Sequence, residues 1–340
     1  MDRTEIAELG EFGLIDFLTK NNETRRAGTI LSVGDDAAII DSFGKQTVVS
    51  TDMLLEGVHF DLMYTPLKHL GFKAVTVNVS DICAMNALPT QITMSIGVSN
   101  RFSVEALTEF YEGVYAACAH YDIDLIGGDT VSAPKGLIIS VTAIGEVAPD
   151  KFVTRSGAGK GDLICVSGDL GAAYLGLQLL EREKKIYLEH PEIQPTLDDR
   201  AYVVGRLLKP EARVDIIEWF EKQEIMPTAM MDISDGLSSE LLHICKQSNL
   251  GCVLYEDKIP FHDETKEVAY QFQADPTACA LSGGEDYELL FTVKQEDFEK
   301  IKFSEKISVV GYMTDIEEGT HIITSGNSKH KLVAQGWQNI

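Results

Sequence analysis

Apolar and polar side chains follow two different periods along this chain, and both periods occur in each half of it. In the first half, residues 90–99 alternate as a half-buried strand does, residues 45–52 predict a strand that runs into polar residues, and residues 136–147 predict a further strand. Helical spacing of apolar residues appears over residues 5–20 and over residues 103–121, where Ser103 is a candidate N-cap. This half therefore predicts a mixture of strands and helices.

The second half repeats this mixture with different lengths. It predicts strands over residues 162–168, 287–293, 306–313 and 321–325, and helices over residues 171–185, 214–223 and 237–249. The charged residues 187–200 predict a solvated connection, and residues 148–152 form a break between the halves. We therefore expect two α/β domains of the α+β type, over residues 1–150 and 151–340.

Two segments give less direct predictions. β-branched side chains alternate over residues 73–87, which favours a strand, although a buried helix can carry a similar composition. Residues 124–130, DLIGGDT, predict a short strand that ends in a glycine turn. Both segments carry an acidic residue in their second half, Asp81 and Asp129 respectively.

The net charge of the chain excludes some classes of binding partner. Among 340 residues, 53 acidic side chains outweigh 29 basic ones, which gives a net charge of −24. This balance argues against a nucleic-acid or anionic-membrane surface, because both need a basic footprint. An anionic substrate would therefore have to bind together with cations.

The spacing of the cysteines and histidines argues against disulfide bonds and against a zinc site. The six cysteines lie mostly among apolar residues and form no CxxC pair, and the eight histidines form no HxxxH or HExxH motif. We therefore expect buried thiols rather than a disulfide framework or a zinc site. The first residues show no apolar stretch behind a basic end, and no apolar run is long enough to span a bilayer. These features predict a cytoplasmic protein.

Oxygen-bearing side chains recur where an apolar run ends. The five places are Asp35 and Asp36; Ser50, Thr51 and Asp52; Asp81; Asp129 and Thr130; and Asp232, Ser234 and Asp235. At any one of them a turn or cap residue is the simpler interpretation, since Asp and Ser dominate turns. Five together favour a cation site, because surface acids usually lie on polar faces rather than at the ends of apolar runs.

The chemistry of these side chains favours a hard cation. Carboxylates and hydroxyls without Cys or His companions suit Mg²⁺ better than zinc. Residues 232–243 do not fit an EF-hand loop, because the glycine falls one place early and the last position is His243. Mg²⁺ commonly takes one or two carboxylates and completes its shell with water and substrate phosphates. The pattern therefore predicts a metal–phosphate site.

Glycine-rich segments supply candidates for holding the phosphates. Residues 155–162, RSGAGKGD, lack the Ser or Thr after the lysine and the upstream glycine that a P-loop requires, so we reject that interpretation. Paired glycines within residues 281–289 and 124–130 each offer backbone N–H groups to an anion. Neither pair decides the question alone.

Nine short motifs in a fixed order give the chain a family resemblance. They are GEFGLID, VGDDAA, STDMLLEGVHF, VNVSDICAM, DLIGGDT, TRSGAGKGD, MDISDGL, LSGGEDYEL and VVGYMT, and the match runs from about residue 8 to residue 337. In this order they closely resemble the thiamine-monophosphate kinase family. That family is similar to aminoimidazole ribonucleotide synthetase and selenophosphate synthetase, with which it shares a superfamily.

The resemblance implies an activity and a fold. Its members use ATP as co-substrate and several Mg²⁺ ions to phosphorylate thiamine monophosphate to thiamine diphosphate, the last step of thiamine diphosphate biosynthesis, without a covalent enzyme intermediate. The implied architecture is a two-domain aminoimidazole ribonucleotide synthetase-like fold. Its N-terminal α/β domain binds metal and ATP and pairs with its twin in a homodimer, and its C-terminal α+β domain closes over the nucleotide. The resemblance also makes residues 73–81 helical, against their propensity.

The resemblance further implies roles for individual residues. The metal ligands would be Asp36, Ser50, Thr51, Asp52, Asp81, Asp129, Asp232 and Asp235. Gly128, Asp129, Arg155 and Ser234 would lie around the ATP phosphates, and His59, Glu285 and Trp337 would contact thiamine monophosphate. Asp35 would be either a ligand or a turn residue. The chain has AGKGD where the family often has AKPGD, which changes a turn and leaves Arg155 in place.

The residues and the resemblance predict the same mechanism. Two phosphate groups must meet, and Mg²⁺ ions that bridge them would neutralise their repulsion and align them. Because the acceptor is already an oxyanion, no general base is required.

Two alternatives remain open at this point. Aminoimidazole ribonucleotide synthetase shares the ATP chemistry but uses an amide acceptor, and a nucleotide-binding regulatory protein would have an inactive site that turnover by the purified chain would exclude. Selenophosphate synthetase would need a reactive Cys near the start, whereas the first is Cys83. A hydrogenase-maturation relative would end in Cys, whereas this chain ends in GWQNI.

Overall fold

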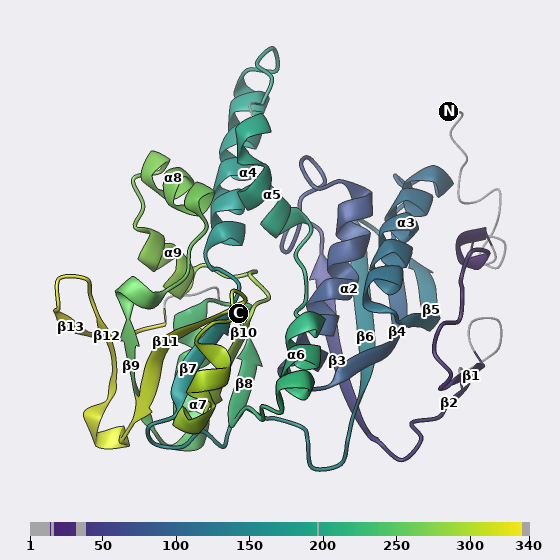
Figure 1. Ribbon diagram of the computed structural model, residues 1–340. Helices are drawn as coiled ribbons and strands as arrows, with labels where there is room; N and C mark the ends of the chain where they lie inside the picture. The colour runs from purple at the N-terminus through teal and green to yellow at the C-terminus, as the bar shows by residue number, and fades with distance from the viewer. Residues whose placement is uncertain (1–13, 15–16, 32–38, 196, 335–340) are drawn as a thin grey trace. The chain divides into compact units, whose positions relative to one another are not determined.

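The computed structural model describes residue 14 and residues 17–31, 39–195 and 197–334 (Figure 1). The chain divides into two compact units, the first from Met1–Ile82 and Ala87–Asp150 and the second from Cys83–Asn86 and Lys151–Ile340. The helix predicted over residues 5–20 falls largely outside the described residues; within them, residues 14 and 17–19 are helical.

The first unit is built on a four-stranded sheet in the order β3-β6-β4-β5. Its strands are β3 (Gln46–Leu55), β4 (Leu88–Val98), β5 (Asp124–Ser132) and β6 (Leu137–Val147). β3 and β4 each pair antiparallel with β6, whereas β5 runs parallel to β4. The strands predicted over residues 45–52, 90–99 and 136–147 are confirmed as β3, β4 and β6, and along β6 buried and half-buried residues alternate without exception. A separate short sheet pairs β1 (Thr29–Leu31) with β2 (Ile39–Ile40).

The prediction that residues 124–130 end in a glycine turn is wrong. Gly127 and Gly128 lie inside β5, opposite Thr93 and Met94 of β4. A Cβ on Gly128 would lie 1.9 Å from the Met94 carbonyl oxygen, so glycine is required here by the close approach of the neighbouring strand. The glycines therefore allow the strand to continue to Ser132 instead of ending it.

Helices α2 (Leu67–Ala84) and α3 (Val104–Tyr121) cover one face of this sheet (Figure 1). α3 matches its prediction, and the Ser103 side chain caps it by accepting the Ala106 N–H at 3.3 Å. The two helices cross closely, because Cβ atoms on Gly71 and Gly113 would lie within 2.0 Å of backbone carbonyl oxygens of the facing helix. Larger side chains at this crossing would force the helices apart.

α2 confirms the helix implied by the resemblance and overturns the strand favoured by β-branched alternation. Every residue from Leu70 to Ser80 is buried, so no polar face reveals a helical period in the sequence. The buried polar side chains bond within the helix: Thr76 Oγ1 donates to the Phe72 carbonyl and Asn78 Nδ2 to the Ala74 carbonyl, each at 3.1 Å. Burial, rather than intrinsic propensity, sets the conformation here.

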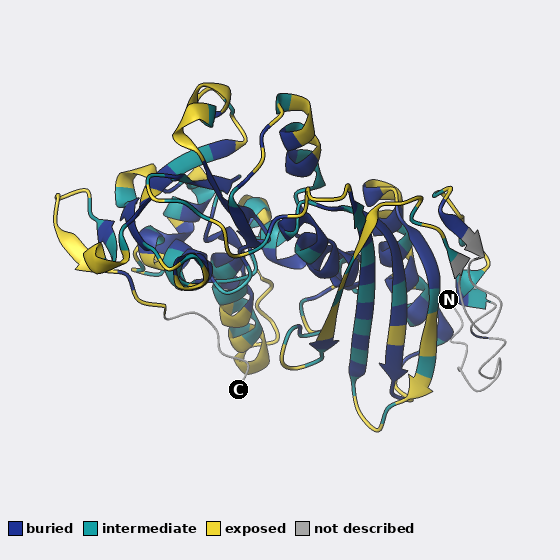
Figure 2. Cartoon of the chain, turned by 90° about the horizontal axis from the view of Figure 1, so that it is seen from below, coloured by how far each residue is buried: buried dark blue, intermediate teal, exposed yellow. Residues whose placement is uncertain are grey.

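The other face of the sheet carries exposed apolar side chains. Figure 2 shows exposed residues along its outer strands. Val49 and Met53 of β3 are 61% and 53% exposed, and Val131 of β5 is 54% exposed. Such apolar side chains on an open face and on edge strands are typical of a surface that another chain covers.

The second unit is built on a seven-stranded sheet in the order β13-β12-β9-β11-β7-β10-β8. Its strands are β7 (Leu163–Ser167), β8 (Ala229–Asp232), β9 (Gly251–Tyr255), β10 (Leu289–Val293), β11 (Ile307–Thr314), β12 (Thr320–Ile323) and β13 (Lys329–Lys331). All neighbours pair antiparallel except β9 and β12, which are parallel. β7, β10, β11 and β12 were predicted; β8, β9 and β13 were not, because they are short and lack a clear alternation.

Helices pack on both faces of this sheet. They are α4 (Ala172–Glu189), α5 (Ala201–Leu208), α6 (Val214–Gln223), α7 (Leu237–Ser248), α8 (Asp263–Gln271), α9 (Pro276–Ser282) and α10 (Phe298–Ile301), with short 3₁₀ turns at Asp198–Arg200, Glu256–Lys258, Gln295–Asp297 and Ile316–Glu318. α7 shares a core with Leu290, while Phe220 of α6 makes an edge contact with Phe291, the next residue of β10. Consecutive strand residues point to opposite faces, so α6 and α7 lie on opposite sides.

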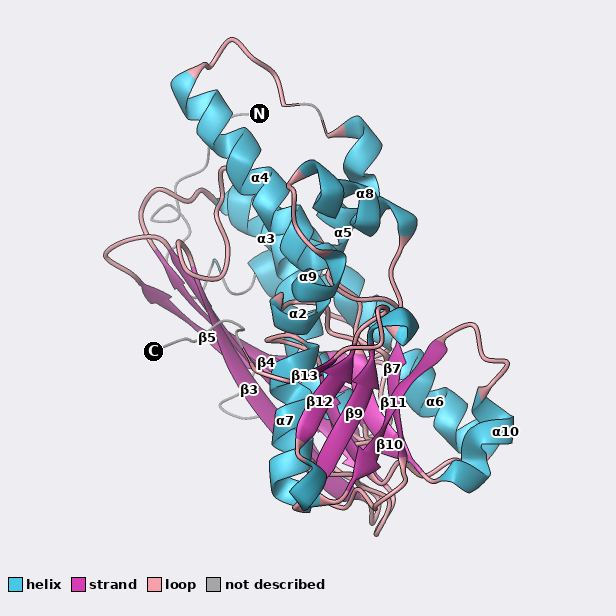
Figure 3. Cartoon of the chain, turned by 90° about the vertical axis from the view of Figure 1, so that its left-hand side faces the viewer, coloured by secondary structure: helices cyan, strands magenta, loops and turns pink. Residues whose placement is uncertain are grey.

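The remaining helices form a second core. α4, α5, α8 and α9 lie together (Figure 3), joined by buried side chains such as Leu175, Val203 and Val268. All six cysteines are free and buried, as expected for reduced thiols. Within the described part of the chain, no helix combines the length and apolar character needed to cross a membrane.

Candidate active site

Two carboxylates, those of Asp52 and Asp81, meet where β3 faces α2. Ser50 and Asp52 are two residues apart on β3 and share one face, while Asn78 and Asp81 lie one turn apart on α2. Ser50 Oγ donates to Asp81 Oδ2 at 2.5 Å, and the Asp52 N–H donates to Asn78 Oδ1 at 2.9 Å. The strand and the helix thus bring together three of the predicted metal ligands.

The electrostatics of this pair suit a cation. Burial and the neighbouring Asp81 carboxyl raise the pKa of Asp52 to about 6. A proton or a divalent cation between the two groups would relieve their repulsion. Among the described residues no three His, Cys, Asp or Glu side chains gather into a complete metal cage. The donor set is therefore a partial, all-oxygen shell, which fits Mg²⁺ bound jointly with phosphate and water.

Thr51 and Asp129 lie on the opposite face of the same sheet. Thr142 Oγ1 donates to Thr51 Oγ1 at 3.0 Å, and the strand pairing places Asp129 beside Ser95 on that face. β3 and β5 are the two edges of four strands, about 14 Å apart at the usual strand spacing. Within one chain the structure therefore does not bring Asp129 to Asp52.

A second group of predicted residues meets in the second unit, where two loops bond to each other. Asp232 ends β8, and Ser234 and Asp235 lead into α7. The N–H of Glu285 donates to the Ser234 carbonyl at 2.8 Å, and the N–H of Tyr287 donates to the Ile233 carbonyl at 2.9 Å. Residues some fifty positions apart in sequence thereby become neighbours.

The region where residues 232–235 meet residues 285–287 has a perturbed carboxyl group and a strained backbone. Burial and the nearby Glu285 raise the pKa of Asp235, against the opposing effect of His243. Glu285 and Tyr287 have φ of 70° and 52°, in the left-handed region. Each such conformation costs a non-glycine residue about 1–2 kcal/mol, so the surrounding contacts must hold it. Strain of this kind is frequent at functional sites.

Glu240 is a residue of this region that the sequence analysis missed. It lies on α7, is buried, and accepts the Asp235 N–H through Oε1 at 3.0 Å. Burial raises the pKa of Glu240 to about 8. Glu240 lies near the start of a helix and closely follows a polar loop, as the glutamate of a capping box does. This position in the sequence could have marked it as a residue that bonds to the loop backbone. Glu240 holds the backbone of a predicted ligand.

Arg155 and Gly128, which the resemblance places around the ATP phosphates, do not gather with the other predicted residues in the described part of the chain. Arg155 is exposed and follows Thr154, whose carbonyl accepts the Met230 N–H of β8 at 3.0 Å. Gly128 is exposed on β5. Asp35, Asp36 and Trp337 lie outside the described residues.

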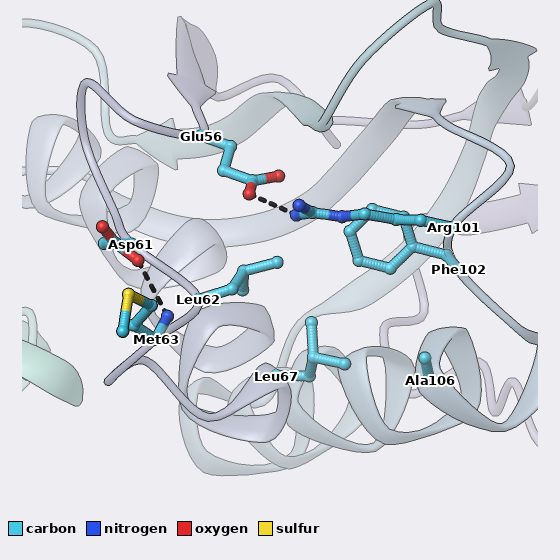
Figure 4. Close-up of a pocket in the computed structure, with 8 residues that line it drawn as sticks. All are labelled: Glu56, Asp61, Leu62, Met63, Leu67, Arg101, Phe102 and Ala106. Atoms are coloured by element: carbon cyan, nitrogen blue, oxygen red, sulfur yellow. Dashed lines mark hydrogen bonds and ion pairs between the residues drawn. The ribbon is translucent and has the colours of Figure 1, made fainter. Parts of the chain in front are cut away.

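His59 occupies a tight turn after β3, between Glu56 and Asp61, two residues that line a pocket of the first unit. Its Nδ1 accepts the Leu55 N–H at 3.1 Å. The pocket, of about 500 Å³, is lined by Glu56, Asp61, Leu62, Met63, Leu67, Arg101, Phe102 and Ala106 (Figure 4). Glu56 pairs with Arg101 and accepts the Leu137 N–H at 3.0 Å, so its carboxylate is fixed at the rim above apolar side chains. The apolar part of this lining suits the rings of a ligand, while Arg101 neutralises the Glu56 carboxylate and lies over the Phe102 ring.

Comparisons with known proteins cover nearly all of the chain. Residues 34–147 match the model of the AIR synthase related protein, N-terminal domain, and residues 159–323 match that of its C-terminal domain. The chain is 35% identical to the thiamine-monophosphate kinase of Aquifex aeolicus (98% of this chain, 99% of the relative). It is 31% identical to that of Bacillus subtilis (97% of this chain, 99% of the relative).

Solved structures give the same picture. AaThiL complexed with AMPPCP and TMP matches with a TM-score of 0.74 at 32% identity, over 100% of both chains. The thiamine-monophosphate kinase of Stenotrophomonas maltophilia matches with a TM-score of 0.78 at 31% identity, over 94% of this chain and 95% of the other. The hydrogenase maturation protein HypE, at 19% identity and a TM-score of 0.75, shares the fold.

Proposed function

Because the chain belongs to the thiamine-monophosphate kinase family, we propose that it transfers the γ-phosphoryl group of ATP to the phosphate of thiamine monophosphate (TMP). The bond between the γ-phosphorus and the bridging oxygen of ATP breaks, a new P–O bond forms to the TMP phosphate, and ADP and thiamine diphosphate leave. The Asp52–Asp81 pair carries this proposal, because two carboxylates in contact supply the cation shell that two meeting phosphates need. Buried free thiols favour a cytoplasmic setting.

We further propose that the oxygen ligands act in two groups, one in each unit. Ser50, Asp52 and Asp81 form the first group, and Asp232 and Asp235 the second. When bound there, Mg²⁺ ions would offset the charge of the phosphates and hold donor and acceptor in line. The chain's own residues bind and orient: Asp36, Thr51 and Asp129 are the remaining proposed ligands, and Gly128, Arg155 and Ser234 hold the ATP phosphates. Because Thr51 and Asp129 lie on the sheet face opposite Asp52, they would not join the first group. Residues 1–150 carry the first group and dimerisation, and residues 151–340 carry the second.

We propose that His59, Glu285 and Trp337, the residues that the family resemblance implies, contact the acceptor. Glu285 lies beside Ser234 and Asp235, where an acceptor phosphate would meet the second ligand group. His59 lies in the sequence between Glu56 and Asp61, which line the pocket of the first unit, and the apolar part of that lining would contact the thiazolium and pyrimidine rings of TMP. Trp337 is assigned to the same substrate. No residue is proposed as a general base, since a phosphate oxyanion already attacks without losing a proton.

The pH dependence of turnover tests this function. The reactive acceptor is the phosphate dianion, which dominates above a pKa near about 6. We therefore expect kcat/KM for TMP to rise through this region, where Asp52 with its pKa of about 6 must also ionise to bind a cation, and then to stay level to about pH 9, because no general base has to lose a proton. A bell-shaped profile with a second ionisation near neutrality would indicate a base-catalysed reaction. A chain that forms no thiamine diphosphate at any pH would overturn the proposed function.

We also propose that the chain forms a homodimer through the open face of the four-stranded sheet. That face carries exposed Val49, Met53 and Val131, and it also carries Thr51 and Asp129, two proposed ligands. A second copy covering the face would remove apolar surface from water and shield the two edge strands.

Light scattering at micromolar concentration is expected to report about twice the chain mass of 37.4 kDa. Met53→Lys, on the open face and outside the proposed ligand set, should shift the chain toward the monomer by placing a charge in the interface. A fully active wild-type monomer would contradict the proposed dimer.

A further inference from the structure

A buried ionic cluster lies beneath residues 283–288, the loop that carries Glu285. Glu288 has only 2% of its side chain exposed and sits between two guanidinium groups. Arg206 Nη1 lies 3.0 Å from its Oε1, and Arg213 Nη1 lies 2.6 Å from its Oε2. Ser167 Oγ adds a hydrogen bond at 2.5 Å. Side chains from α5, the start of α6 and the end of β7 therefore converge on one carboxylate, and none of them has a role in the reaction proposed for the chain.

Arg206 connects this cluster to the backbone of the loop. Its Nη2 donates to the Asp286 carbonyl at 3.1 Å and to the Asp169 carbonyl at 3.2 Å. Asp286 is the residue between Glu285 and Tyr287, the two left-handed residues. Arg213 instead directs its other nitrogens to Asp215, at 2.9 and 3.1 Å. Both arginines bond to the Glu288 side chain, but among the hydrogen bonds that the structure shows for the described residues only Arg206 also bonds to a backbone carbonyl of the loop.

Further contacts restrain the same loop from its other side. The Asp286 carboxylate accepts the Gly171 N–H at 2.8 Å, at the start of α4. The Ile233 N–H donates to the Glu288 carbonyl at 2.7 Å, next to the bonds that join the loop to residues 233 and 234. Two left-handed non-glycine residues would otherwise relax to ordinary φ values, which would turn the Glu285 side chain to a different direction.

Stability alone does not account for the buried charges. Apolar side chains of similar volume commonly replace a buried ion cluster at no loss of stability, whereas such a cluster can select one conformation. Here the conformation selected is that of the loop, because Arg206 spans from Glu288 to the Asp286 carbonyl.

We propose that Arg206, held in place by Glu288, is a positioning residue for the acceptor substrate: it fixes residues 283–288 in the conformation that directs Glu285 toward TMP. This inference rests on the proposed function, in which Glu285 contacts TMP. Arg206 acts through Glu285 and does not itself touch the substrate.

A double-mutant cycle tests this role. Arg206→Lys keeps the charge but loses the planar fork that reaches both Glu288 and the carbonyls. It should raise KM for TMP by about 10-fold and change KM for ATP by less than about twofold. Glu285→Gln should raise KM for TMP by a similar or larger factor. In the Glu285→Gln background, Arg206→Lys should add less than about twofold, because the side chain it positions no longer contributes.

Arg213→Lys is the matched control, because it also weakens the contact with the Glu288 side chain, whereas Arg213 makes no hydrogen bond to the loop backbone among those that the structure shows for the described residues. It should lower the melting temperature about as much as Arg206→Lys does and leave KM for TMP within about twofold of wild type. Should Arg206→Lys not fold, Glu288→Gln carries the same cycle, because it keeps the side-chain volume.

Three outcomes would overturn the inference: an unchanged KM for TMP in a folded Arg206 variant, full additivity with Glu285→Gln, or the same KM change in Arg213→Lys. A wild-type chain that makes no thiamine diphosphate would instead reject the proposed function.

Discussion

Replacing Asp52 or Asp81 by asparagine is expected to lower kcat by about 100-fold or more while the chain stays folded. Each substitution removes a ligand charge at the point where β3 meets α2 and keeps the side-chain shape. Because burial and Asp81 raise the pKa of Asp52 to about 6, the two carboxylates oppose each other in the free protein. Neutralising one should therefore leave the melting temperature unchanged or raise it slightly.

The measurement is steady-state turnover of TMP over a Mg²⁺ titration, with the melting temperature of each variant recorded beside it. Lost turnover that added Mg²⁺ partly restores would identify ligand residues. Glu112→Gln is the matched control, because Glu112 pairs with Lys68 at 3.2 Å on an exposed part of α3 and should behave as wild type. Wild-type turnover in both aspartate variants, or full activity in excess EDTA, would reject the assigned ligands.

Free thiamine is expected to react at least about 1000-fold more slowly than TMP at saturating ATP and Mg²⁺. Thiamine offers an alcohol, which must lose a proton as it attacks, and a positioned general base contributes about 10²- to 10⁴-fold to such a step. The phosphate of TMP also supplies charge that the proposed cation shell holds in place, and thiamine lacks it. Both effects act in the same direction.

The comparison is a steady-state experiment with either acceptor in excess over enzyme, following ADP and the phosphorylated product. Thiamine should still compete with TMP, because its rings are those that the pocket of the first unit would bind. Comparable rates for the two acceptors would exclude the phosphate-acceptor mechanism and require a catalytic base in the site.

Much of the fold was predictable from periodicity because many elements have one buried and one solvated face. β6 alternates along its whole length and α6 begins and ends at its predicted residues. α2 was not predictable in this way, since it is buried on all sides and its β-branched residues favour a strand by propensity. Only the family resemblance gave the correct assignment.

The end of β5 was predicted wrongly, because one of its paired glycines serves a close approach between strands. A paired glycine usually marks a turn, but Gly128 lies in a strand because the Met94 carbonyl leaves no room for a side chain. Nothing in a single sequence distinguishes these two demands on glycine.

The candidate site was predictable residue by residue but not in its arrangement. The oxygen-bearing side chains at the ends of apolar runs include Asp52 and Asp81, which the structure joins, and Asp129, which it places on the opposite face. The supporting residues were missed, because Arg206, Glu240 and Glu288 look like ordinary charged residues until burial is known. Burial is a property of the whole fold and leaves little local signal.

Transfer of labelled γ-phosphoryl from ATP to TMP by the purified wild-type chain, with Mg²⁺ present, tests the central claim most directly. The predicted result is label in thiamine diphosphate, in amounts equal to the ADP formed, no labelled protein, and no product in excess EDTA. ADP formed without thiamine diphosphate, or binding of both ligands with no product, as in a regulatory protein with an inactive site, would contradict it.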